Sequence, residues 1–167
     1  MSNLSRRTFV AGLAGAALAS LASPAWAQAF PQSFSSFAVD VSVLKAKGLG
    51  GFADLVAGAT LAELRRSFAD RVDPRGPRLI VRLTSVDLTA FPDGGGERWW
   101  GGGRGGGGTD SVEGEALAVG PRGEILARHP QLAVLDVRTS ILTPNEQGRA
   151  IAVAQHYVRW LRRELIS

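Results

Sequence analysis

The chain has 167 residues, a formal net charge of +4 and no cysteine. This length fits one domain, and the lack of cysteine excludes disulfides, thiolate chemistry and iron–sulfur clusters. The 19 basic and 15 acidic residues are interspersed, and no basic stripe alternates with aromatic residues. The sequence therefore disfavours nucleic-acid binding.

The first 27 residues have the pattern of an export signal. Arg6 and Arg7 are followed by an uncharged run rich in alanine, glycine and leucine, which ends at the small-residue frame Ala25-Trp26-Ala27. The adjacent arginines with Phe9 are similar to the twin-arginine signal. An uncleaved membrane helix is the alternative, but the run falls short of the about 20 strongly apolar residues that spanning needs.

We therefore expect cleavage after Ala27 and a mature domain of residues 28–167 in the periplasm. Its net charge is +2, because Arg6 and Arg7 leave with the signal and no acidic residue does. A chain of about 140 residues is long enough to build a hydrophobic core without cross-links.

The first part of the mature chain predicts a strand, a helix and a second strand. Apolar residues alternate over 37–43, which is typical of a strand, and residues 45–51 follow as a glycine-rich turn. Over residues 52–69 the apolar spacing becomes helical, with Gly58 as a weak point, and a proline-rich turn ends the helix. Residues 78–88 form the strongest strand signal, and their unequal faces predict one covered side and one partly open side.

The second part predicts two more strands and a final helix. Residues 111–119 alternate as a strand, and residues 120–123 form a tight turn. A further strand covers 124–128 and 131–137, with Pro130 marking an edge or a bulge. Thr143, Pro144 and Glu146 form a capping box with proline at the first helical position, and a helical apolar stripe follows to Leu165.

This order, β-α-β-β-β-α, predicts an α+β fold. Two helices can pack on one face of a four-stranded mixed sheet, which gives a two-layer sandwich. The first two strands are joined through a helix, so we expect them to be parallel, and the later strands form an antiparallel meander.

Residues 92–109 form a glycine- and tryptophan-rich segment between two predicted strands. The spacing Gly101-x-Gly103-x-x-Gly106 matches a dinucleotide fingerprint only because the segment is nearly all glycine, and no helix follows it. A flexible connection is the simplest interpretation. Its larger side chains are candidates for contact with a partner, a glycan or the membrane surface. They are Arg98, Trp99, Trp100 and Arg104.

Few residues are candidates for chemistry. His129 and His156 show no metal-ligand spacing, so we expect structural roles for both and neither a metal nor a cofactor. The common hydrolase signatures do not occur. Glu113 and Glu115 lie two residues apart on a predicted strand and thus share one face, where a desolvated carboxylate can act as acid or base. Arg82 on the neighbouring strand, or Arg122 and Arg128, are candidates to balance their charge.

The layout resembles that of small exported proteobacterial envelope proteins. An export signal precedes a strand, a long helix, the strand Pro-Arg-Leu-Ile-Val-Arg-Leu-Thr-Ser-Val-Asp-Leu, the Gly/Trp segment and a strand with Gly-Glu-Ile-Leu-Ala. In outline it is similar to the α/β domain of curli-secretion lipoproteins over residues 37–165. The resemblance implies an envelope role and transfers no catalytic residue. The chain lacks the lipobox cysteine, so lipid anchoring is not implied.

Three functions remain open at this point. The first is a non-enzymatic periplasmic binding or accessory domain for an envelope component. The second is a periplasmic hydrolase that uses Glu113 and Glu115 on the open sheet face. The third is a folded companion of an enzyme exported by the twin-arginine route. A deep pocket around the two glutamates would favour the hydrolase, and a flat exposed face would weaken it.

Overall fold

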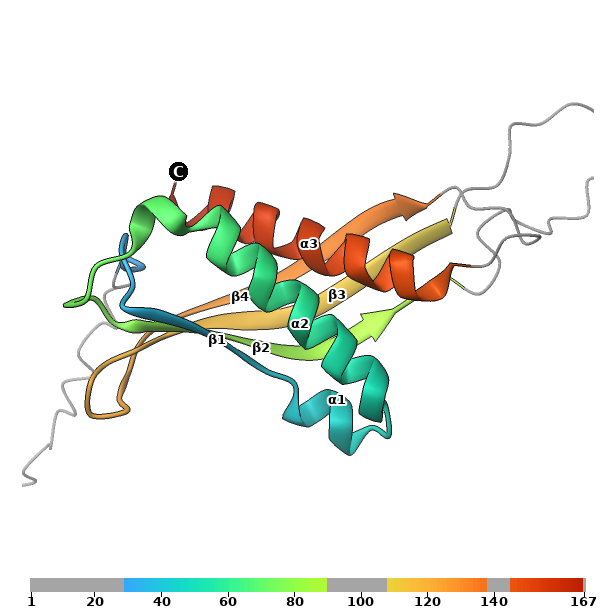
Figure 1. Cartoon of the computed structure of the whole chain (residues 1–167), viewed down its shortest axis with the longest axis horizontal. Coiled ribbons are helices and arrows are strands. Elements are labelled where there is room, and N and C mark those ends of the chain that lie inside the picture. Colours follow the sequence, from blue (N-terminus) through green and yellow to red (C-terminus); the bar gives the residue numbers. More distant parts are fainter. Residues whose placement is uncertain (1–28, 90–107, 138–144, 167) are drawn as a thin grey trace, which may run out of the picture.

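A computed structural model describes residues 29–89, 108–137 and 145–166 (Figure 1). The elements, in chain order, are β1 (Ser36–Asp40), α1 (Ser42–Ala46), α2 (Gly50–Ser67), a 3₁₀ turn (Ala69–Arg71), β2 (Arg78–Asp87), β3 (Gly108–Val119), β4 (Ile125–Val137) and α3 (Glu146–Leu165). The strands form one sheet in the order β1-β2-β3-β4, in which β1 is parallel to β2 and the other pairs are antiparallel. The α+β sandwich and the parallel first pair are confirmed.

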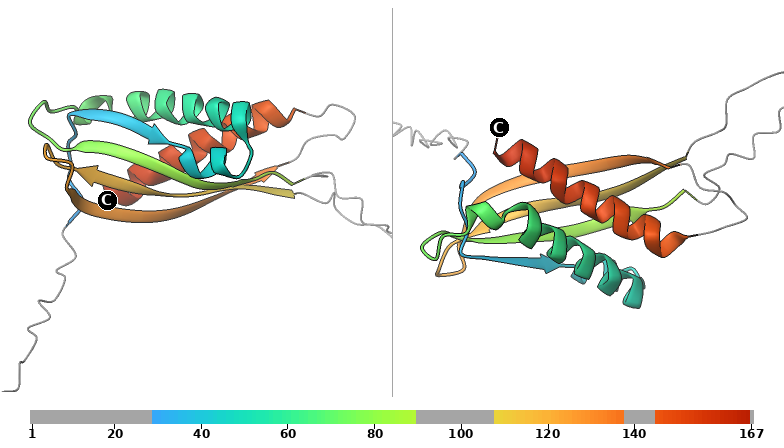
Figure 2. Two further views of the ribbon diagram at one scale, coloured as in Figure 1. Left: turned by 90° about the horizontal axis from the view of Figure 1, so that it is seen from below. Right: turned by 45° about the horizontal axis from the view of Figure 1, so that its top comes forward.

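Helices α2 and α3 lie side by side on the same face of the sheet, and none of the described helices lies on the opposite face (Figure 2). The core lies between these two layers. On β2, Leu79, Val81 and Leu83 are fully buried, whereas Ile80 and Arg82 between them are only partly buried on the open side. The period of two in this strand therefore separates a covered face from an open one, as the sequence predicts.

The first described residues close one end of the core. Phe34 is fully buried, and its ring lies 5.8 Å from that of Phe68 at the end of α2 and 6.3 Å from that of Phe37. The Phe34 backbone N–H donates to the Arg71 carbonyl at 2.8 Å. The segment before β1 is thus part of the folded domain.

Several element boundaries differ from the sequence prediction, and β3 begins at Gly108, inside the segment of residues 92–109 that was expected to be a loop. β1 ends at Asp40 instead of residue 43, and the short helix α1 replaces the end of the expected strand and the start of the expected turn. The Ser42 N–H donates to the Asp40 carboxylate at 2.9 Å, which turns the chain, and Leu44 of α1 is fully buried. The strand prediction for Val41 and Val43 was therefore wrong.

The last helix begins at Glu146, later than expected. Its cap is Asn145, whose side chain accepts a hydrogen bond from the Gly148 N–H at 2.9 Å. The sequence analysis placed the cap at Thr143, which lies outside the described residues together with Pro144.

The sheet has a long edge strand, β4, which contains Pro130. This confirms the edge position expected for the proline, which has no N–H to donate. The imidazole of His156, on α3, is hydrogen-bonded to the Val134 backbone of the same strand.

Among the described helices, none has the length and apolar content that crossing a bilayer requires.

Candidate functional site

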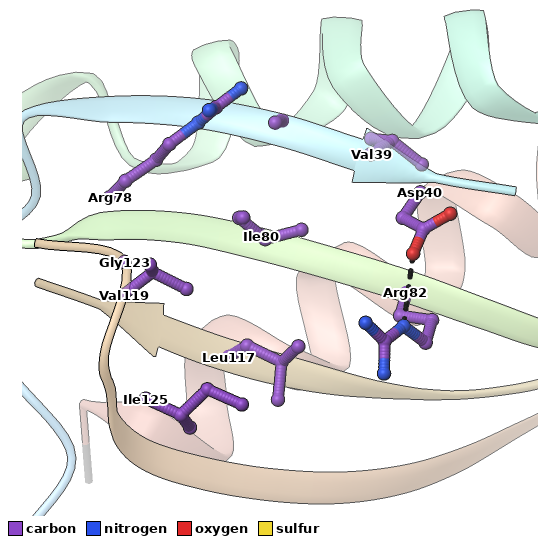
Figure 3. Close-up of a pocket in the computed structure, with 10 residues that line it drawn as sticks. Val39, Asp40, Arg78, Ile80, Arg82, Leu117, Val119, Gly123 and Ile125 are labelled. Carbon is purple, nitrogen blue, oxygen red and sulfur yellow. Dashed lines mark hydrogen bonds and ion pairs between the residues drawn. The ribbon is translucent and has the colours of Figure 1, made fainter.

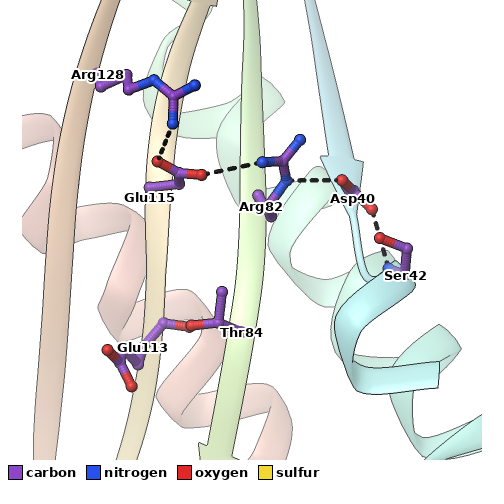
Figure 4. Close-up of polar contacts among 7 residues, drawn as sticks. All are labelled: Asp40, Ser42, Arg82, Thr84, Glu113, Glu115 and Arg128. Atoms are coloured by element: carbon purple, nitrogen blue, oxygen red, sulfur yellow. Dashed lines mark hydrogen bonds and ion pairs between the residues drawn. The ribbon is translucent and has the colours of Figure 1, made fainter. Parts of the chain in front are cut away.

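A row of charged side chains crosses the open face of the sheet, with one residue from each strand. Asp40, Arg82 and Glu115 are neighbours in the strand register, and Arg128 reaches Glu115 from β4 (Figure 4). Arg82 Nε lies 2.9 Å from Asp40 Oδ2 and its Nη1 lies 3.1 Å from Glu115 Oε1. Arg128 Nη1 lies 3.4 Å from Glu115 Oε2. We call these four residues the charge ladder.

The charges of the ladder compensate one another. Hydrogen bonds from the Ser42 hydroxyl and backbone, together with Arg82, hold the pKa of Asp40 below its ordinary value. The Asp40 carboxylate in turn raises the pKa of Arg82. Opposite signs alternate across the four strands, so the ladder supports their register without leaving a net charge.

Glu113 and Glu115 share the open face, as the sequence predicts, but their surroundings differ. Glu115 is 21% exposed, and both its carboxylate oxygens are in ion pairs with arginines. Glu113 is exposed one row farther along β3, and its backbone carbonyl accepts a hydrogen bond from Thr84 Oγ1 at 3.2 Å (Figure 4). Neither carboxylate lies in a desolvated pocket of the kind that raises reactivity.

A hollow of about 370 Å³ lies beside the charge ladder, toward the turn between β3 and β4 (Figure 3). Its floor is apolar and spans all four strands, because the open-face residues of adjacent strands lie next to one another in this part of the register. The Asp40–Arg82 ion pair lies at one rim, and Arg78 lies at the other. The apolar floor consists of Ala38, Ile80, Leu117, Val119 and Ile125. We call this feature the sheet-face hollow.

Exposed apolar side chains continue along the edge strand on the other side of the ladder. Leu132 is 60% exposed and Val134 is 48% exposed, and their partners in the register are Glu113 and Ser111. Two residues apart on one strand, they point to the same face. We call Leu132 and Val134 the edge patch. The acidic residues Glu113 and Asp136 lie beside it, both exposed.

The remaining candidates from the sequence are placed as follows. His129 packs edge-on against Phe30, with ring centroids 6.4 Å apart, and His156 lies between the Val134 backbone and Trp160. Within the part of the chain that the structure describes, no three histidine or acidic side chains gather closely enough to hold a metal ion. Arg98, Trp99, Trp100 and Arg104 lie outside the described residues.

Sequence reasoning missed a buried ion pair where β2 and β3 meet the Gly/Trp segment. Asp110 is fully buried, and Arg149 of α3 approaches it with two nitrogens, of which Nε lies 2.9 Å from Oδ2. Arg149 also donates to the Thr89 carbonyl at 2.8 Å, and the Thr89 N–H donates to Asp110 at 3.0 Å. These contacts fix both stems of the segment. The available signal was an arginine in the first turn of a helix whose other basic residues lie near its end.

No protein-family model matches this sequence, and no curated protein is a detectable relative. The chemistry of the open face therefore has to be interpreted from its own residues.

Proposed function

We propose that the protein is a non-enzymatic binding or accessory domain of the periplasm, which docks on an envelope protein through the open face of its sheet. The edge patch carries this proposal. Leu132 and Val134 lie adjacent on one face and are largely exposed, although β-strand residues of this type are normally covered.

The state of the carboxylates favours binding over hydrolysis. A hydrolase that uses Glu113 and Glu115 needs one carboxylate desolvated and the other free to act. Here Glu115 is held by Arg82 and Arg128, and Glu113 faces solvent. The charge ladder and the edge patch form a broad surface that suits a macromolecular partner.

The charges around the edge patch indicate the chemistry of the partner. Glu113 and Asp136 flank the apolar pair, and neither makes an ion pair with another described residue. A partner surface with an apolar centre and a basic rim complements this arrangement. An exported enzyme with such a surface fits the same proposal, in which case the protein is its folded companion.

Site-specific cross-linking in the periplasm tests the proposal. A photoreactive residue at position 111, the register neighbour of Val134, should trap one partner reproducibly. Leu132→Asp should abolish the cross-link and change the free energy of unfolding by no more than about 0.5 kcal/mol, because the side chain is largely exposed.

Val72→Asp is the matched control, because Val72 is 56% exposed but lies in the connection before β2 instead of on the open face. It should leave the cross-link intact. A cross-link that survives Leu132→Asp, or that is lost equally in both variants, contradicts docking through the edge patch.

A further inference from the structure

The sheet-face hollow combines an apolar floor with a cation, Arg78, that makes no ion pair with another described residue. Ile80 and Leu117 lie at the centre of the floor, and Ile125, which is 44% exposed, leaves it accessible to solvent. Figure 3 shows Arg78 extending across β1 at the rim. A ligand that enters here meets aliphatic side chains first and a guanidinium beside them.

The charges of the lining leave one positive charge uncompensated. Arg82 and Asp40 pair with each other, so their charges cancel at the far rim. Glu124, in the nearby turn, accepts a hydrogen bond from the Arg122 N–H at 3.0 Å. Arg78 makes no ion pair with any residue in the described ranges, so its guanidinium is available to a carboxylate.

The size and openness of the hollow select among anionic ligands. Its volume of about 370 Å³ equals that of about 12 water molecules at about 30 Å³ each. The hollow is open, because Ile125 in its floor is 44% exposed, so an acyl chain lying on the floor would keep one side of its length in water. A peptide segment places a short aliphatic group and a carboxylate side by side without that exposure.

We propose that the sheet-face hollow binds an extended polypeptide segment that carries an aliphatic side chain next to a carboxylate, with the aliphatic group on Ile80 and Ile125 and the carboxylate on Arg78. This inference rests on the proposed function, because the segment belongs to the docked partner. The hollow and the edge patch lie on opposite sides of the charge ladder. An experiment can therefore reject peptide binding in the hollow without rejecting docking through the edge patch.

Peptide titration followed by the backbone amide signals of the purified protein tests the inference. The probes are acetyl-Ser-Gly-Leu-Glu-Gly-amide, its glutamine counterpart and its alanine-for-leucine counterpart. The first peptide should shift the amides of Ala38, Ile80, Val119 and Ile125, and the other two should bind more weakly. Arg78→Gln should weaken the acidic peptide by about two- to fivefold and remove its advantage over the glutamine peptide. Added salt should weaken binding of the acidic peptide to the native protein but not to Arg78→Gln.

Ile125→Ser is a second variant, and it should keep the fold because the Ile125 side chain is partly exposed. It should weaken the binding of every peptide that contains leucine. Arg65→Gln removes an exposed arginine of α2 that makes no ion pair among the described residues, and it should leave peptide binding unchanged.

The inference is overturned if the acidic peptide at millimolar concentration shifts no amide signal of the hollow. It is also overturned if Arg78→Gln and Arg65→Gln bind alike, if decanoate binds there and the peptide does not, or if sedimentation shows a second copy of the chain covering the hollow. If Leu132→Asp abolishes the cross-link from position 111 but no peptide binds to the hollow, the proposed function is retained and only this inference is rejected.

Discussion

At the residue scale, Asp110 and Arg149 form a buried ion pair on which the stability of the domain depends. Asp110 is fully buried and Arg149 is 9% exposed, so each charge depends on the other for its solvation. Removing one partner of such a pair costs about 3–5 kcal/mol, because the remaining charge is left uncompensated in a low-dielectric environment.

We therefore expect Asp110→Asn to lower the free energy of unfolding, measured in urea, by about 3–5 kcal/mol. The double variant Asp110→Leu with Arg149→Met should lose less than the single variant, because it leaves no unpaired charge. A single variant as stable as the native protein would show that the pair is solvated.

His156 makes stability depend on pH in a predictable direction. Burial, followed by the positive charges of Arg159 and Arg163, lowers the pKa of His156 below its ordinary value of 6.5. Below pH 6.5 the imidazole is protonated in the unfolded chain but still largely neutral in the folded chain. The free energy of unfolding therefore falls as the pH falls through the folded pKa.

The native protein should therefore lose more thermal stability between pH 7 and pH 5 than His156→Gln does, since the variant has no titrating group there. Carboxylates common to both proteins cancel in this comparison. Parallel stability curves for the two proteins would contradict the expected shift.

At the element scale, two glycines have opposite roles. Gly58 is exposed on α2, and a Cβ added there meets no atom within 4 Å. Gly114 is buried on β3, where an added Cβ would overlap the Arg82 carbonyl oxygen and lie 3.1 Å from the Tyr157 hydroxyl. The first glycine only weakens its helix, and the second allows close packing of β3 against β2 and α3.

Gly58→Ala should raise the free energy of unfolding by about 0.5–1 kcal/mol, through lower chain entropy and better helix propensity. Gly114→Ala should lower it by about 1–3 kcal/mol, because a backbone carbonyl cannot yield as a flexible side chain does. Chemical denaturation of the two variants checks both signs, and equal effects would refute the distinction.

The sequence predicts the elements well where one period dominates and poorly where local hydrogen bonds decide. The alternation over residues 78–88 specifies β2 and its two faces, and Pro130 marks the edge strand. The alternation from Phe37 to Val43 is equally regular, yet the Asp40 carboxylate captures the Ser42 N–H and ends the strand early. Val41, just before α1, and Leu44 within it then fill the core, and an alternating strand pattern does not predict this placement.

At the scale of the whole molecule, the described helices cover only one face of the sheet, and the segment before β1 closes one end of the core. Phe34 is fully buried between the rings of Phe68, Phe37 and Phe30. We expect Phe34→Ala to lower the free energy of unfolding by about 3–5 kcal/mol, because it leaves a cavity within this aromatic cluster.

Calorimetry of this variant checks the expectation, with Leu132→Ala as a control that should cost little because Leu132 is 60% exposed. A loss below about 1 kcal/mol for Phe34→Ala would mean that the segment detaches readily from the core.

The candidate site is predictable only in part, because its residues come together through the sheet. Glu113 and Glu115 share a face by local spacing alone, and the sequence analysis named Arg82 as their neighbour. Asp40 joins them only because β1 pairs with β2 in parallel, which places Asp40 beside Arg82. No local pattern reports a register between segments so far apart in the chain, and the sheet-face hollow depends on that same register.

The features of β4 also bear on the tendency of the protein to aggregate at high concentration. An uncovered strand edge can template the addition of further chains and so start a fibril. In this molecule, Pro130 offers no donor to an incoming strand, and the Val134 backbone is already engaged by His156. The edge next to the edge patch thus offers an incoming strand fewer free backbone groups than a regular exposed strand would.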